Sequence, residues 1–177
     1  MLGPVARSLP ALAAVAAVAV VGAASAGGAA RLTPCAGSQL AGAFKAVPGS
    51  AGAGNITYAL TLRNVSHSEC TLTGLPQGRL LGKTGKALPT NVRAAFPGAL
   101  AAVLVRLAPG KSTRATARFT PDVPGPGEPV AGTQCEPVAY RFRVAAPGGG
   151  TTKVKLAPPT SVCVHGRLLF SAYGIVT

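Results

Sequence analysis

Apolar and polar residues alternate with a period of two along much of this chain. The segment from Asn55 to Arg63 shows the pattern most clearly, because Ile, Tyr and Leu alternate there mainly with Asn, Thr and Arg. Such alternation is typical of a β-strand with one buried face and one face in solvent. The same pattern, or a short apolar run, predicts further strands over 40–47, 70–73, 79–82, 102–107, 114–120, 138–144, 153–156 and 162–173.

Turn signals separate nearly all of these segments. Gly and Pro clusters lie between them, and no amphipathic helical run of useful length follows the N-terminal apolar segment. Roughly eight or nine short strands with turns between them predict an all-β, antiparallel sandwich. The longest irregular piece, 121–137, is rich in Pro, and we expect it to be a surface excursion. It contains three of the four acidic residues, namely Asp122, Glu128 and Glu136.

One hairpin can be predicted in more detail. A Pro-Gly-Gly-Gly sequence is a strong turn signal between the segments 138–144 and 153–156. A register centred on Gly149 places Val144 opposite Val154, and a slip of one residue would turn one inward row outward. The same register sets Arg143 opposite Lys155, and like charges directly opposite each other are mildly destabilising.

The chain contains four cysteines, and none lies in the N-terminal apolar segment. An even number of cysteines in an exported chain indicates disulfides. Cys135 and Cys163 are equally distant from Gly149, so a bridge between them would close the base of the hairpin. Among the three possible pairings we favour Cys35–Cys70 with Cys135–Cys163. The cysteines are too widely spaced for the short pairs of a zinc site, so we expect them to be structural.

The first 26 residues predict a helical signal peptide. Arg7 supplies a positive charge, an apolar run follows over 9–23, and Ala24-Ser25-Ala26 forms an A-x-A cleavage site. The run is too short for a comfortable transmembrane helix, and an uncleaved signal anchor is the alternative. We therefore expect a signal peptide over 1–26, a short linker over 27–34 and a single domain over 35–177.

A second motif follows the clearest strand. Gly54 to Asn64 forms a strand that ends in Asn, and the segment 70–76 then reads C-x-L-x-G-x-P. An L-x-P-G turn at 107–110 and the late cysteine pair complete the pattern. Over roughly 35–177 the chain resembles the secreted actinobacterial family called domain of unknown function 4232. The resemblance implies an exported, disulfide-bonded, immunoglobulin-like β-sandwich, and it implies no activity and no catalytic residues.

The chain is strongly basic, with a formal net charge of +13. Several basic side chains occupy outward positions on three expected strands, and they would form a basic face if those strands share a sheet. Such a face would attract an anionic wall polymer, an anionic membrane surface or an acidic protein. The alternative is a solvated surface that keeps the protein soluble. The candidate residues are Arg114, Arg118, Arg141, Arg143, Lys153 and Lys155.

The sequence offers no clear catalytic or metal-binding constellation, so we expect no enzyme, metal or cofactor. His67 lies in a polar loop, His165 is expected on a strand beside Gly166, and no nucleophile elbow is present. Asp122 and Glu128 lack the spacing of a calcium loop. A copper carrier usually contains more Met and His than this chain.

These patterns predict a secreted, non-catalytic protein at the cell envelope that binds an anionic wall polymer or partner. A purely structural secreted protein without a ligand is one alternative. An unrecognised hydrolase is another, and it requires His67 or His165 to lie with a serine and an acid in a concave site. We expect no nucleic-acid partner, because no groove-reading motif is present. The oligomeric state does not follow from the sequence.

Overall fold

The computed structural model describes residue 3 and residues 32–97, 103–129 and 134–175. The chain divides into two units, 1–30 and 31–177, and the second is described below. The expected signal peptide over 1–26 lies outside the described residues, apart from residue 3. Within the described ranges, no helix is both long and apolar enough to span a membrane.

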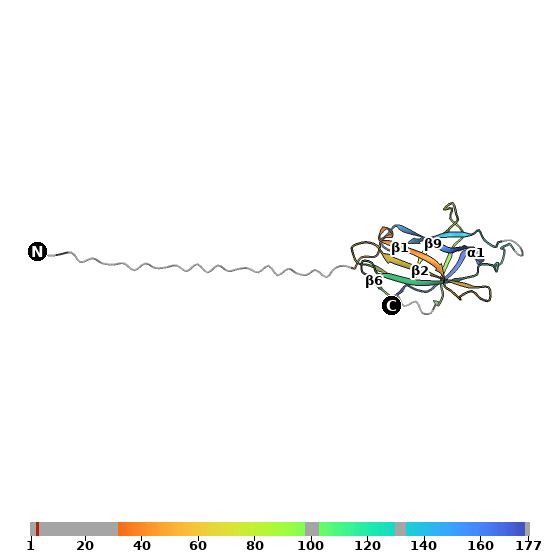
Figure 1. The fold of residues 1–177 in the computed structure, drawn as a ribbon, viewed down its shortest axis with the longest axis horizontal. Coiled ribbons are helices and arrows are strands. Elements are labelled where there is room, and N and C mark those ends of the chain that lie inside the picture. Colours follow the sequence, from red (N-terminus) through yellow and green to blue (C-terminus); the bar gives the residue numbers. More distant parts are fainter. Residues whose placement is uncertain (1–2, 4–31, 98–102, 130–133, 176–177) are drawn as a thin grey trace. The chain divides into compact units, whose positions relative to one another are not determined.

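The regular elements in the described part of the chain are almost entirely β-strands (Figure 1). Two one-turn helical segments, η1 (Gly37–Gln39) and α1 (Cys163–Gly166), accompany them. The strands are β1 (Leu40–Ala46), β2 (Ile56–Asn64), β3 (Cys70–Leu72), β4 (Gln77–Leu81), β5 (Asn91–Ala94), β6 (Val105–Leu107), β7 (Ser112–Phe119), β8 (Ala139–Ala145), β9 (Thr151–Thr160), β10 (Arg167–Phe170) and β11 (Gly174–Ile175).

The main sheet has the order β4-β8-β9-β1-β2-β7-β10-β5, with β11 paired to β7, while β3 and β6 form a separate ribbon. Most neighbours are antiparallel, but β1 runs parallel to β9 and β10 runs parallel to β5. The expectation of a purely antiparallel arrangement is therefore wrong at these two pairs. Alternation along a strand determines which face is buried, and it carries no information about the direction of the neighbouring strand.

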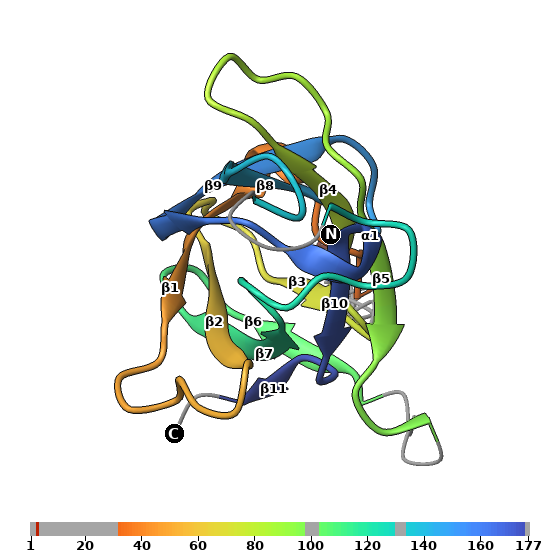
Figure 2. The same ribbon diagram turned by 90° about the vertical axis from the view of Figure 1, so that its right-hand side faces the viewer.

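The main sheet curls until its distant strands face each other. Phe142 on β8 and Phe170 on β10 are five strands apart in the sheet order, yet their ring centroids are 5.8 Å apart. In a flat sheet that separation would be roughly 24 Å, because neighbouring strands are about 4.8 Å apart. In Figure 2, β8 and β9 lie on one side of the interior, and β2 and β7 lie on the other. The result is a nearly closed, barrel-like sheet.

The core confirms the alternation expected on β2 and β7. Tyr58, Leu60 and Leu62 are buried from β2, and Ala115, Ala117 and Phe119 are buried from β7. The intervening residues of both strands are more exposed. The largest fully buried side chains of the whole core are Tyr58, Phe44, Phe142, Phe170, Leu60, Leu62, Leu72, Leu80, Leu81, Leu107, Leu156 and Leu168.

The hairpin of β8 and β9 forms, but its register differs from the expected one. Val144 lies opposite Thr152, and Arg143 lies opposite Lys153. The turn is centred on Gly148 instead of Gly149, so each β8 residue lies opposite a β9 residue two positions earlier than expected. A shift of two residues keeps every side chain on its own face of the sheet. The hydrophobic pattern therefore excludes a one-residue slip and cannot distinguish this register from the expected one.

An irregularity in the pairing of β8 with β9, at the start of β8, changes which residues face the core. The pairing with β9 shifts between Ala139 and Arg141, so Ala139 is fully buried and Tyr140 is only half-buried. The inward row expected through Val138 and Tyr140 is wrong for these two residues, while Phe142 lies in the core. Between these two pairs, from Ala139↔Thr160 to Arg141↔Lys155, β9 has the extra residues, and the alternation of β8 is interrupted at the same point.

The expected strand over 162–173 is interrupted. Residues Cys163–Gly166 form the α1 turn, and Val164 and His165 have φ values of 58° and 54°. Non-glycine residues are uncommon in this left-handed region. His165 is therefore not on a strand as expected. The strand β5, which pairs with β10, was not expected from the sequence.

Both disulfides connect segments that precede or follow strands. Cys35 is bonded to Cys70 at the start of β3, with the two Cα atoms 4.8 Å apart. Cys135 is bonded to Cys163 at the start of α1, with the two Cα atoms 5.5 Å apart. This is the pairing favoured from the sequence, and the second bridge joins the segments just beyond the two strands of the hairpin.

Candidate functional site

Four of the six basic candidate residues lie together on adjacent strands. Arg143 is opposite Lys153, and Arg141 is opposite Lys155. The neighbouring strand β4 places Arg79 opposite Arg143 on the other side. We call these five residues the β8–β9 basic face. Arg79 was not among the residues expected on this face, because β4 contains too few alternating residues to define its outward positions.

The other two candidates, Arg114 and Arg118, lie on β7, which β1 and β2 separate from β9 in the sheet. Arg114 borders a hollow of about 410 Å³ together with Lys45 from β1. Arg118 lies opposite Leu169 on β10, farther from the basic face. The six candidates therefore divide into a group of four and two separate residues.

The acidic residues lie away from the basic face. No Asp or Glu occurs within β4, β8 or β9. Glu69 forms an ion pair with Arg106, with the Nε atom 2.6 Å from Oε1. The hydrogen bond from Arg106 holds the pKa of Glu69 below its ordinary value. Glu128 and Glu136 gather near α1 instead, so the basic face has no internal neutralising partner on its own strands.

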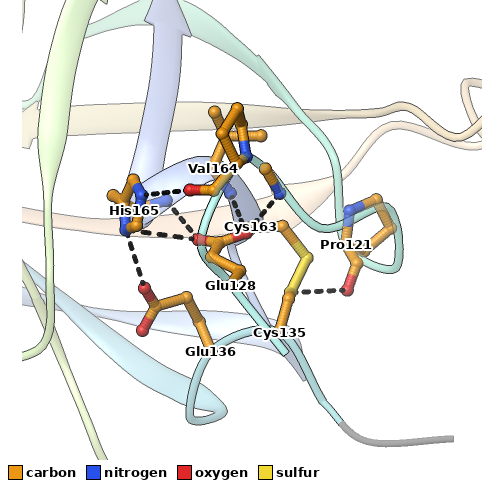
Figure 3. A network of polar contacts seen from close by, with 9 residues as sticks. Pro121, Glu128, Cys135, Glu136, Cys163, Val164 and His165 are labelled. Atoms are coloured by element: carbon orange, nitrogen blue, oxygen red, sulfur yellow. Dashed lines mark hydrogen bonds and ion pairs between the residues drawn. A yellow bond between two sulfur atoms is a disulfide. The ribbon is translucent and has the colours of Figure 1, made fainter. Parts of the chain in front are cut away.

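Glu128 is the centre of a second polar site, shown in Figure 3. Its side chain is only 2% exposed. One carboxylate oxygen accepts backbone N–H bonds from Gly125 at 2.6 Å and from Val164 at 2.8 Å. The other accepts the backbone N–H of His165. The carboxylate thus holds the two non-glycine residues of α1 that have a left-handed backbone, a conformation that costs free energy without such support.

The side chain of His165 faces two carboxylates (Figure 3). Its Nδ1 atom is 3.7 Å from an oxygen of Glu128 and 3.8 Å from an oxygen of Glu136. Its Nε2 atom is 3.1 Å from the carbonyl oxygen of Pro126. The imidazole is 61% exposed, whereas the Glu136 side chain is 13% exposed. We call Glu128, Glu136 and His165 the acid–histidine cluster.

The two carboxylates of this cluster have opposite electrostatic environments. Burial works to raise the pKa of Glu128, but three backbone N–H bonds outweigh it and lower the pKa below its ordinary value. Burial and the neighbouring charge of Glu128 both raise the pKa of Glu136. Divergent pKa values in two adjacent carboxylates often mark functional sites, and they also occur in structural networks.

The Cys135–Cys163 disulfide brings the acid–histidine cluster together. Glu136 directly follows Cys135, and His165 is two residues after Cys163. Sequence analysis treated His165 and the acidic residues separately, and so missed the cluster. The favoured disulfide pairing was the signal that could have found it, because it places these two segments side by side.

A hollow of about 610 Å³ adjoins the cluster. Glu136 belongs to both the hollow and the cluster, since it lines the hollow and its carboxylate faces His165. Tyr140 and Val138, which are only half-buried, line the hollow as well. The loop between β4 and β5 contributes Lys83, Lys86 and Leu88. The hollow thus combines apolar side chains with a few charged groups, as small-molecule sites do.

The two histidines differ in their surroundings. His67 is exposed in the loop that follows β2. His165 lies with two acids, but the nearby Ser161 hydroxyl donates to the carbonyl oxygen of Glu136 at 2.8 Å. Over residues 32–97, 103–129 and 134–175, no serine hydroxyl is hydrogen-bonded to either imidazole.

Comparison with known proteins identifies the family. The family model described as "Domain of unknown function (DUF4232)" matches residues 35–171. This range includes both disulfides, the acid–histidine cluster and the basic face. No curated protein and no solved structure matches the chain. Because the match covers most of its length, the chain belongs to the DUF4232 family.

Proposed function

We propose that this protein is a secreted, non-catalytic domain that binds an anionic polymer of the cell envelope through the β8–β9 basic face. Export is supported by the two disulfides, which persist in oxidising compartments, and by the signal-peptide pattern of the first 26 residues. The family name carries no activity, so the proposal rests on the chemistry of the surface itself.

The observation that carries the proposal is a row of like charges across three strands. Arg79, Arg143 and Lys153 lie directly opposite one another, and Arg141 lies opposite Lys155 in the adjoining row. Like charges in directly opposite positions destabilise a sheet. A solvated surface without a ligand gains nothing from this arrangement. A polyanion lying across β4, β8 and β9 would relieve the repulsion between them.

The spacing of the basic face suits a polymer with repeated negative groups. Adjacent strands are about 4.8 Å apart, and alternate residues along a strand are about 7 Å apart. Basic side chains of the β8–β9 basic face therefore form a short two-dimensional array. Their long aliphatic stems let the charged ends adjust to phosphate or carboxylate groups of irregular position. Affinity then comes from charge density, without a shaped pocket.

We also infer that the curled sheet is an immunoglobulin-like sandwich. In that fold, strands C, F and G form one sheet and strands A, B and E belong to the other. If β4, β8 and β9 are C, F and G, and β1, β2 and β7 are A, B and E, the neighbours among these six strands match, while β10 takes the place beside β7 that strand D has beside E. Strand β1 then pairs with both sheets, which joins them into one continuous hydrogen-bonded order.

Removal of three charges from the basic face is expected to weaken binding to isolated bacterial cell walls at least about tenfold. The variant replaces Arg79, Arg143 and Lys153 with Gln. Each basic side chain near an anionic surface contributes up to about 1 kcal/mol, and 1.4 kcal/mol corresponds to a factor of ten. The measurement is the bound fraction in a pelleting assay, with NaCl raised from about 50 mM to about 500 mM.

A matched control removes three charges elsewhere. Arg93 and Arg118 flank Leu169 of β10 from both sides, and Arg167 lies on the same strand. Their replacement with Gln lowers the net charge equally, and retention is expected to stay near the wild-type level. Equal losses in both variants would attribute binding to overall charge, against the proposal. Retention that does not depend on salt would also contradict the proposal. No retention at low salt would contradict it too, and would favour a purely structural protein.

A further inference from the structure

Three electron-pair donors converge in the acid–histidine cluster. They are Nδ1 of His165, one oxygen of Glu128 and one oxygen of Glu136, and they all lie within 4.8 Å of one another. Glu128 is almost completely buried, and Glu136 is largely buried. Buried carboxylates in such proximity repel each other unless a cation lies among them. The cation is either a proton or a metal ion.

The other ring nitrogen of His165 determines which atom faces the carboxylates. Nε2 is 3.1 Å from the carbonyl oxygen of Pro126, and a carbonyl can only accept. Nε2 therefore carries the hydrogen, and neutral imidazole then directs the lone pair of Nδ1 toward the two carboxylates. Histidines that bind metals commonly donate their second N–H to a backbone carbonyl in this way.

The distances show that His165 shares no proton with either carboxylate, so the alternative to a metal ion is a proton between Glu128 and Glu136. Nδ1 is 3.7 Å and 3.8 Å from the two carboxylate oxygens, which is too long for a hydrogen bond. Zinc binds such donors at about 2.1 Å, so two ligands of a tetrahedral ion lie about 3.4 Å apart. A small inward movement of the exposed imidazole, or of Glu136, would bring the donors to that separation.

We propose that Glu128, Glu136 and His165 bind a divalent first-row transition metal ion of the zinc type. One imidazole and two carboxylates are suitable ligands for such an ion, and a divalent charge neutralises both carboxylates. The exposure of His165 provides an entry path and leaves room for a water molecule as the fourth ligand. The site is separate from the basic face, so the two proposals can fail independently.

The surrounding structure holds two of the ligands in place. Backbone N–H groups of Gly125 and Val164 fix one oxygen of Glu128, and the other oxygen accepts the backbone N–H of His165 while it lies 3.7 Å from Nδ1 of the same residue. The Ser161 hydroxyl binds the Glu136 carbonyl, and the neighbouring disulfide joins the segments that carry Glu136 and His165. Pre-positioned ligands of this kind reduce the ordering required when an ion binds. The bound ion would connect the 121–137 segment to α1.

The test is a titration of the oxidised, tag-free protein with ZnCl₂ after removal of metal by a chelator. Isothermal titration calorimetry is expected to detect one saturable ion per chain. His165→Asn and Glu136→Gln are each expected to weaken binding at least about tenfold. Asn tolerates the left-handed backbone at position 165, and Gln has nearly the shape of Glu. Glu128 is left unchanged, because its carboxylate also holds the backbone of α1.

His67→Asn is the matched control, since it removes the exposed loop histidine, and its zinc affinity is expected to equal that of the wild type. Thermal unfolding gives a second measurement: zinc is expected to raise the Tm of the wild type and of His67→Asn, but not that of His165→Asn. Melting without zinc verifies that each variant folds. The absence of saturable zinc binding to the wild type would overturn the proposal and assign the cation to a proton. Binding that His165→Asn leaves intact would overturn it as well.

Discussion

Replacement of Phe44 with alanine is expected to lower the free energy of unfolding by about 3–5 kcal/mol. Phe44 is fully buried on β1, and its ring centroid is 5.5 Å from that of Tyr58, 5.7 Å from that of Phe142 and 5.8 Å from that of Phe170. These partners come from β2, β8 and β10, so one side chain contacts both sides of the curled sheet. Its loss leaves a cavity that these three partner strands cannot fill by a local movement.

The measurement is urea denaturation followed by circular dichroism. Phe96→Ala is the matched control, because the Phe96 residue is 70% exposed and the same atoms are removed. Its effect is expected to stay within about 0.5 kcal/mol. Domains of this size are stable by about 5–15 kcal/mol, so the Phe44 variant is expected to be partly unfolded at elevated temperature. A loss below about 1 kcal/mol for Phe44→Ala would contradict a central role for this ring.

Alternation predicted the strands that have one buried face and are long enough to show it. The inward row of Tyr58, Leu60 and Leu62 on β2 lies in the core as expected. Strand β5 was missed, because its alternation covers only the four residues Asn91–Ala94 and none of them is fully buried. A strand at the edge of a sheet can form through backbone hydrogen bonds to β10 alone, and backbone bonds leave no pattern in the sequence.

The errors at the hairpin and at α1 have a different origin. The observed register and the expected one bury the same side chains, so the hydrophobic effect does not choose between them. The conformation of the loop 146–150 makes the choice, with φ values of 93° at Gly149 and 71° at Gly150. At α1, the sequence around Val164 favours a strand, and the carboxylate of Glu128 overrides that preference from 36 residues away. Local propensity yields to tertiary contacts of this kind.

Contacts between residues far apart in the sequence also determine which candidate site residues lie together. The basic face could be predicted in part, because charges that alternate with apolar residues on a strand necessarily point outward. Arg114 and Arg118 also point outward, and their separation from β9 depends on strand order, which alternation does not encode. Prediction of the acid–histidine cluster would have required both the disulfide pairing and the fold of the 121–137 segment. Sequence spacing alone therefore concealed a site whose three residues meet only in the folded chain.

The family motif of a strand ending in Asn has a physical explanation at Asn64. This residue ends β2 and is completely buried. Its amide nitrogen donates to the carbonyl oxygens of Ser68 at 2.7 Å and Leu107 at 2.8 Å. Its amide oxygen accepts from the backbone N–H of Ser66 at 2.9 Å and from the Ser66 hydroxyl at 2.7 Å. Asn64 thereby fixes the loop that leads to Cys70, and no other residue type supplies two donors and an acceptor in this shape.

Asn64→Asp is therefore expected to destabilise the protein by about 3–5 kcal/mol at neutral pH. The change keeps the shape of the side chain but leaves two buried carbonyl oxygens without donors, at about 1–3 kcal/mol each, and it sets a carboxylate against them. Burial and the two carbonyls favour the protonated acid in the folded state, so its pKa rises above the unfolded value. The protein binds more protons when folded, and the penalty is accordingly expected to shrink as pH falls toward about 4.

Denaturation by urea at neutral and acidic pH measures both effects, each relative to the wild type under the same conditions. Asn55→Asp is the matched control, because its amide makes one exposed bond, to the carbonyl oxygen of Ala53. We expect that variant to change stability by less than about 1 kcal/mol. If Asn64→Asp resembled Asn55→Asp, the amide would not be the group that fixes the loop. A penalty that grew on acidification would mean that the aspartate is ionised and accommodated, contrary to the hydrogen bonds that Asn64 makes in the fold.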